Sequence, residues 1–106
     1  MPVLGYQQKL QVAATTGDGQ EVNARGETRE NTFYVQGSNG VSAGAVQIET
    51  ASEAGYAGTW APVGPPVTVP SNAETIMQVT GCFKFLRARI STNLTGGTVT
   101  VEACGS

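Results

Sequence analysis

Short stretches of alternating side chains, separated by turn residues, constrain the fold of this chain more than any other feature. Clusters of glycine, proline, asparagine and serine interrupt the sequence repeatedly, as in GDG, GSNG, GPP and NLTGG. No long segment repeats its apolar residues with the 3.6-residue period of a helix. Short strands with turn signals roughly every eight to twelve residues are typical of antiparallel sandwiches and small barrels. We therefore expect an all-β fold.

Individual segments alternate as strands do. In the segment 44–52, Val46 and Ile48 point one way while Gln47 and Glu49 point the other way. Comparable segments predict about eight short strands in total. The sequence thus predicts an antiparallel β-sandwich, jelly-roll-like, or a small barrel, because both have this turn spacing.

The length of the chain predicts a single domain. The 106 residues are enough to bury one hydrophobic core and too few for two. We therefore expect residues 1–106 to form one β domain. Residues 1–8, which precede the first clear alternation, form a candidate N-terminal arm.

The charges of the chain limit its partners. Charged residues make up 13% of the sequence and the net charge is −2, whereas about a quarter of a typical soluble domain is charged. No basic run could neutralise phosphates, so we expect no nucleic-acid binding. No apolar stretch approaches the roughly 18 residues of a membrane span, and the start MPVLGYQQ is not a signal peptide. We expect a product of the cytoplasm that does not bind membranes.

The residue types needed for catalysis are scarce. The chain has no histidine, which removes most general-base, triad and metal-site schemes. Carboxylate pairs such as Glu49 with Glu53 have no spacing that distinguishes them from solvated carboxylates. Cys82 and Cys104 could form one disulfide, but two separate, half-buried thiols are the favoured interpretation, since the cytoplasm keeps thiols reduced. We therefore expect no enzyme, no cofactor and no metal site.

The segment 83–92, FKFLRARIST, is the most strand-like part of the chain. As a strand it turns an apolar face, with Leu86, Ala88 and Ile90, toward a core. Its opposite face carries what we name the aromatic–arginine stripe: Phe83, Phe85, Arg87 and Arg89. Aromatic residues and arginine are enriched at the centres of interfaces, so the stripe is the first candidate docking surface. Alternatively, a loop of the same chain covers the two phenylalanines and the arginines are solvated.

A second candidate surface lies in YAGTWAPVGPP. Tyr56 and Trp60 could form a platform on which a sugar ring stacks. Alternatively, and more in keeping with its size, Trp60 belongs to the core or to the end of a sheet.

The order of strand and turn segments resembles small virion proteins of tailed bacteriophages. The resemblance covers residues 32–106 and rests on FYVQG, GAVQIETA, GTWAPVG, VTV, IMQVTGCFKFLRARIS and GGTVTV in this order. In such proteins a strand ending in a segment like RARIS follows a GTW-x-P strand, and a glycine-rich turn leads to a final strand. The segments are structural and include no catalytic signature.

The resemblance implies a capsid decoration protein, also called a cement protein. Such proteins are small, β-rich and often homotrimeric. They assemble in the host cytoplasm onto the outer surface of the virion, where they bridge neighbouring major capsid proteins. The aromatic–arginine stripe would then face an acidic partner surface. The second contact would come from the N-terminal residues Pro2, Val3, Leu4 and Tyr6, as an arm or an added strand.

Other functions remain open at the level of sequence. The main alternative is a head-fibre or tail-tip module that binds a receptor or glycan through Tyr56 and Trp60. A tail-tube or baseplate subunit would carry longer insertion loops. Fold alone does not choose among these functions.

Overall fold

The computed structural model describes residues 6–24 and 29–106, and these ranges form strands, turns and loops without a helix. Its strands are β1 (Tyr6–Ala14), β2 (Glu21–Asn23), β3 (Glu30–Gly37), β4 (Ala43–Ala51), β5 (Ala61–Pro62), β6 (Val67–Thr68), β7 (Ala73–Thr80), β8 (Phe85–Thr95) and β9 (Val99–Gly105). Within these ranges no helix could cross a membrane.

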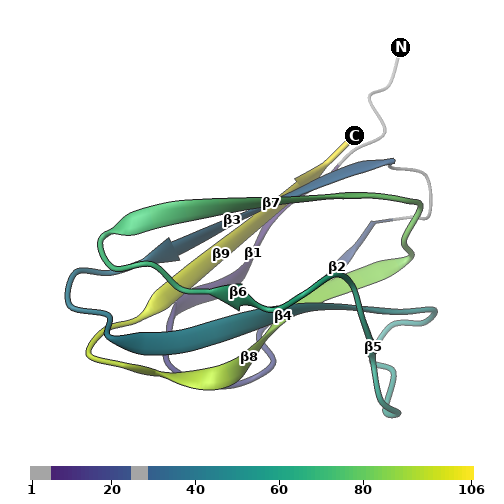
Figure 1. Cartoon of the computed structure of the whole chain (residues 1–106). Coiled ribbons are helices and arrows are strands. Elements are labelled where there is room, and N and C mark those ends of the chain that lie inside the picture. Colours follow the sequence, from purple (N-terminus) through teal and green to yellow (C-terminus); the bar gives the residue numbers. More distant parts are fainter. Residues whose placement is uncertain (1–5, 25–28) are drawn as a thin grey trace.

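The strands form two antiparallel sheets that pack face to face (Figure 1). The four-stranded sheet has the order β1-β9-β3-β7, and the five-stranded sheet has the order β2-β8-β4-β5, with β6 also paired to β4. The predicted all-β class is confirmed, and of the two predicted architectures the structure is the sandwich.

The core lies between the two sheets. The four-stranded sheet contributes fully buried Phe33, Val35, Val99 and Val101, and the five-stranded sheet contributes Val46, Ile48, Leu86 and Ala88. Burying each of the larger side chains stabilises the fold by about 1.5–3 kcal/mol. The predicted apolar face of β8 is confirmed, because its alternate residues enter this core, as those of β9 also do.

Strand β1 departs from the alternation in its sequence. Leu10 and Gln11 are both buried, while Val12 is 63% exposed, because the register with β9 shifts on both sides of Gln11. Such bulges turn a side chain to the opposite face. The Gln11 amide then donates hydrogen bonds to the carbonyl oxygens of Ala88, at 2.7 Å, and Gly17, at 3.1 Å. Gln11 therefore ties the two sheets together.

After β1 the chain crosses to the other sheet. The backbone N–H of Ile90 donates to the carbonyl of Gly17, and that of Leu94 donates to the carbonyl of Thr15. These bonds close one side of the sandwich against β8.

The outer face of β4 is covered. Gln47 and Glu49, which the alternation places on a face opposite the core, are 8% and 5% exposed. The Gln47 amide donates to the carbonyl oxygens of Ile48 and Gly64, so the segment after β4 folds back over this strand. The middle of β4 is buried on both faces.

The predicted arm is replaced in part by strand. Pro2, Val3 and Leu4 lie outside the described residues. Tyr6 begins β1 and pairs with Gly105 of β9, and its hydroxyl donates to Asn31 Oδ1 at 2.9 Å. Because Asn31 is fully buried, Tyr6 closes one end of the sandwich instead of extending from it.

Candidate binding surface around Glu49

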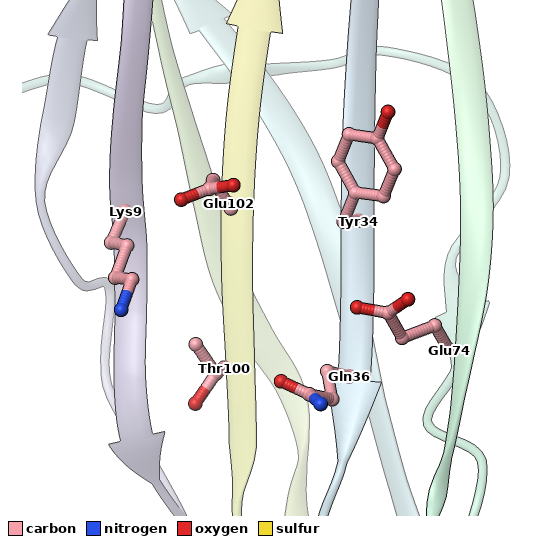
Figure 2. A pocket seen from close by; sticks show the side chains of 6 residues that line it. All are labelled: Lys9, Tyr34, Gln36, Glu74, Thr100 and Glu102. Atoms are coloured by element: carbon pink, nitrogen blue, oxygen red, sulfur yellow. The ribbon is translucent and has the colours of Figure 1, made fainter.

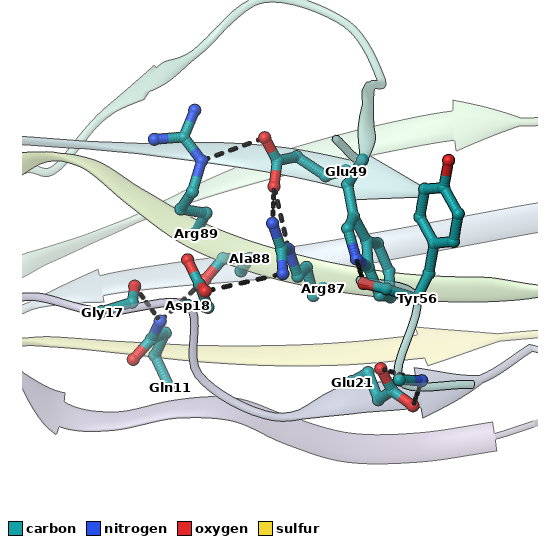
Figure 3. Close-up of polar contacts among 11 residues, drawn as sticks. Gln11, Gly17, Asp18, Glu21, Glu49, Tyr56, Arg87, Ala88 and Arg89 are labelled. Atoms are coloured by element: carbon teal, nitrogen blue, oxygen red, sulfur yellow. Dashed lines mark hydrogen bonds and ion pairs between the residues drawn. The ribbon is translucent and has the colours of Figure 1, made fainter. Parts of the chain in front are cut away.

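Glu49 binds two arginines on the outer face of the five-stranded sheet (Figure 3). It lies directly opposite Arg87 in the β4–β8 register, and Arg89 follows two residues along β8 on the same face. Arg87 Nε and Nη2 lie 2.9 Å from Oε1, and Arg89 Nε lies 3.0 Å from Oε2. Each carboxylate oxygen therefore has a guanidinium partner, as a buried carboxylate requires.

Arg87 is fully engaged within the chain. Its guanidinium lies 4.4 Å from the centroid of the Trp60 ring, which is a cation–π contact. Its Nη1 lies 3.6 Å from Asp18 Oδ2, and its side chain is only 19% exposed. Arg87 is therefore a structural residue that covers Trp60 and neutralises Glu49.

Arg89 keeps a free end. Glu49 holds its Nε, while its Nη1 and Nη2 contact no acceptor within residues 6–24 and 29–106. Its side chain is 39% exposed. A guanidinium held at one nitrogen and open at two loses little further freedom when it binds a carboxylate or phosphate in a fork. Arg89 is the residue on this face best placed to bind an anionic group of a partner.

The predicted stripe is only partly a surface. Phe85, Arg87 and Arg89 share the outer face of β8, as predicted. Phe83 precedes the strand and is half-buried against the hydrophobic core, so it does not share the outer face of β8, and its role in a contact stays a prediction. The predicted contact of both arginines with an acidic partner is reduced to Arg89, because Glu49 and Asp18 of the same chain engage Arg87.

The predicted two-ring sugar platform is not formed. Trp60 is 3% exposed, whereas Tyr56 is 40% exposed. The Trp60 indole N–H donates to the backbone carbonyl of Tyr56 at 3.0 Å, and Arg87 lies over the ring. The interpretation of Trp60 as a buried residue is the one that the structure supports.

The residue that organises this face was not singled out from the sequence. Glu49 appeared as one of several solvated carboxylates, because the β4–β8 register was unknown. Two features of the sequence could have indicated this role. One is a glutamate within a mostly apolar strand segment, and the other is the pair of arginines in RARIS. The Gly55 N–H donates to the carboxylate of Glu21, at 2.9 Å to Oε1 and 3.2 Å to Oε2. No residue pattern near Glu21 in the sequence indicates this contact.

The opposite face of the molecule has a shallow depression of about 390 Å³ (Figure 2). Its lining comes from the outer face of the four-stranded sheet: Lys9, Tyr34, Gln36, Glu74, Thr100 and Glu102. In Figure 2 these side chains are spread over the strands and do not converge on one point. The depression follows the surface of the four-stranded sheet.

The two cysteines lie in different parts of the fold. Cys82 is exposed in the β7–β8 connection, Cys104 is half-buried in β9, and both are free thiols. Among the described residues, no group of three or more cysteine, aspartate or glutamate side chains is close enough together to bind a metal ion.

Comparisons with known proteins identify a fold. No protein-family model matches the chain, and no curated protein sequence matches it either. The crystal structure of the SPBc2 prophage-derived protein YomS superposes with a TM-score of 0.61 at 18% identity, covering 99% of this chain and 96% of YomS. A subunit of Bacillus endospore appendages, described as disulfide-linked pili, superposes with a TM-score of 0.47 at 16% identity, covering 96% and 84% of the two chains. The chain therefore shares the YomS fold over its whole length.

Proposed function

We propose that this protein is a structural virion protein that binds the outer surface of a phage capsid and bridges major capsid proteins. The observation that carries the proposal is the anchored Arg89, whose terminal nitrogens are exposed beside a rigid network of Glu49, Arg87 and Trp60. A preorganised guanidinium suits an acidic patch on a protein partner, because it can bind a carboxylate through two parallel hydrogen bonds.

Two further observations support the proposal. The YomS fold belongs to a prophage-derived protein, which agrees with the phage resemblance of the sequence. The Glu49 carboxylate is already paired with the guanidinium groups of Arg87 and Arg89, so this face suits docking better than chemistry. In this proposal the protein is not an enzyme and needs no cofactor.

A modest interface is sufficient for such a protein. Many copies on one shell act together, so each contact can be weak while the coat remains bound. In this proposal the protein is made in the host cytoplasm and resides on the outer capsid surface. The homotrimer that the resemblance implies stays a prediction.

The first experiment is co-sedimentation of the purified protein with capsids of the encoding phage that have been stripped of minor proteins. We expect binding that saturates at a fixed ratio to the major capsid protein. Arg89→Ala should weaken binding on the order of tenfold, which corresponds to about 1.4 kcal/mol for a lost charged hydrogen bond. Lys9→Ala is the matched control, because it removes one positive charge from the other sheet.

Three outcomes would count against parts of the proposal. A protein that ignores capsids would overturn it, and binding to cells or glycans would favour the head-fibre or tail-tip alternative. Saturable binding with Arg89→Ala and wild type indistinguishable would retain the capsid function and remove Arg89 from the contact.

A further inference from the structure

Strand β7 is an unprotected edge of the sandwich. It runs for eight residues at the side of the four-stranded sheet and pairs with β3 alone in the part of the chain that the structure describes. Its register with β3 is unbroken from Glu30–Thr80 to Gly37–Ala73, so no bulge bends it. The strand contains no proline and no lysine, which are common devices against edge pairing.

The other edges are protected. Strand β1 is bulged on both sides of Gln11, and its Leu10 carbonyl already accepts the Gln20 N–H. Strand β2 has three residues, while β5 and β6 have two each, with Pro62 and the Pro65–Pro66 pair among them. Among the described strands, β7 is therefore the long, straight edge without such protection.

The backbone of β7 directs hydrogen-bonding groups outward. Gly81 N–H donates to the Arg29 carbonyl at 2.9 Å, which marks that pair as hydrogen-bonded. Hydrogen-bonded and non-hydrogen-bonded pairs alternate along an antiparallel ladder, so every second β7 residue before Gly81 points its N–H and C=O toward β3. The backbone groups of Glu74, Ile76 and Gln78 then point away from β3, toward the free edge. No described residue accepts from or donates to them.

We infer that β7 pairs antiparallel with β7 of a second copy of this chain, with Ile76 facing Ile76. The two four-stranded sheets would join across a two-fold axis at this residue. Ile76 is 58% exposed and lies opposite half-buried Tyr34 of β3. The pairing would place the two copies of Ile76 side by side, with a Tyr34 flanking each, in one apolar row.

The charges of β7 favour a second copy of this chain as the partner that pairs with its free edge. Ile76 lies near the middle of β7, so a two-fold axis there makes the strand complementary to itself. Glu74 then faces Gln78 of the second copy, and no like charges meet across the ladder. This contact extends the proposed function, because it uses the face opposite Arg89 and leaves the Arg89 surface open.

The test is the mass of the purified protein in solution, without capsids. Sedimentation equilibrium over a concentration series should show a dimer of the 10.9 kDa chain. Ile76→Lys should raise the dissociation constant at least about tenfold, because two lysines would face each other across the axis. Val12→Lys is the matched control, since Val12 is equally exposed at 63% but lies on β1, and it should leave the dimer intact.

Two further variants test the edge and its register. Ile76→Pro removes only an N–H that points away from β3, so it should abolish the dimer while the circular dichroism spectrum is retained. In a Cys82→Ser background, Ile76→Cys should form a disulfide-linked dimer under mild oxidation, because facing residues in a hydrogen-bonded pair lie about 5.5 Å apart at Cα. Val12→Cys in the same background should not.

The inference is overturned if the wild type is a monomer at every concentration, or if Ile76→Lys self-associates as the wild type does. A trimer that persists in Ile76→Lys and Ile76→Pro would also overturn it, and would agree with the threefold assembly implied by the resemblance. These results are independent of capsid binding, which is measured separately.

Discussion

At the scale of single residues, Glu49 explains why the arginines of β8 have different roles. Arg87 lies directly across the ladder and has its guanidinium between Glu49, Asp18 and Trp60. Arg89 lies diagonally, so that it reaches Glu49 through Nε alone. The buried Glu49 carboxylate thus gives Arg87 a structural role, while the guanidinium of Arg89 stays partly open to solvent.

Removing the Glu49 charge tests this arrangement. Glu49→Gln leaves Arg89 without its counter-charge and leaves Arg87 with Asp18 alone. We expect a loss of about 3 kcal/mol in the free energy of unfolding, at the lower end for a broken buried pair, because Arg89 remains 39% exposed. Urea denaturation would measure it. Glu53→Gln, on an exposed residue shortly after β4, should stay within about 0.5 kcal/mol of the wild type, and equal losses in both variants would contradict the interpretation.

Tyr6 makes the stability sensitive to alkaline pH. Burial, with a smaller contribution from the Cys104 thiol, raises the pKa of Tyr6 above its ordinary value. The unfolded chain releases this proton near pH 10, whereas the folded chain retains it. Stability from Tyr6 is therefore complete below about pH 10 and falls above it by up to about 1.4 kcal/mol per pH unit.

The variant Tyr6→Phe isolates this effect. At pH 8 it should be less stable than the wild type by about 1 kcal/mol, because the bond to Asn31 is lost. Near pH 11 the difference should narrow or reverse, since phenylalanine has no proton to release. Urea midpoints of both proteins at the two pH values would show this, and a constant difference would argue against a buried, neutral Tyr6.

At the scale of elements, alternation predicted strands correctly wherever a strand has one face in the core. The segment that became β8 has the predicted inner residues Leu86, Ala88 and Ile90. The pattern failed in β1, where bulges bury Gln11 and expose Val12. It also failed on β4, where the segment after the strand covers Gln47 and the arginines of β8 cover Glu49. Bulges and covering loops depend on tertiary register, which no local pattern encodes.

The junction of β3 with the segment before β7 depends on a close approach of two backbones. At Gly37, the last residue of β3, an added Cβ would overlap the carbonyl oxygen of Pro70 and lie 2.9 Å from Val69 Cγ1. We expect Gly37→Ala to destabilise the protein by about 1–3 kcal/mol, as overpacking does, although Gly-to-Ala changes at open sites commonly stabilise. Thermal unfolding would measure it. Asn39→Ala, at an exposed position nearby, should have little effect, and a neutral Gly37→Ala would show that the two segments can separate at low cost.

At the scale of the whole molecule, the architecture could be predicted from the sequence, whereas the binding surface could be predicted only in part. Turn spacing and alternation suffice for a sandwich, because each strand has to bury one face. The site required knowing that β4 and β8 are neighbours and that Glu49 faces Arg87, a contact between residues far apart in the sequence. Trp60 shows the same limit, because Arg87, which lies over its ring, is far from it in the sequence.

The two sheets should unfold as one unit. Gln11 of β1 bonds to β8 of the opposite sheet, and the backbone bonds from Ile90 and Leu94 to the crossing segment join the sheets again. Neither sheet can expose its inner face without opening the shared core. A single cooperative transition is therefore expected, as for most domains of this size. Trp60 lies on the five-stranded sheet and is the single tryptophan of the chain, so its fluorescence reports on that sheet, whereas far-UV circular dichroism reports on both.

The urea midpoints from these two signals should coincide in the wild type. Gln11→Ala removes the amide that bonds to Ala88 and Gly17 and leaves the buried Ala88 carbonyl without that donor, at a cost of about 1–3 kcal/mol. Both midpoints should fall together in this variant, because the loss is shared by both sheets. Gln7→Ala, on an exposed residue of the same strand, should leave them unchanged. A fluorescence midpoint that separates from the dichroism midpoint in the wild type would mean that the five-stranded sheet folds independently, and that Gln11 connects two units instead of completing one.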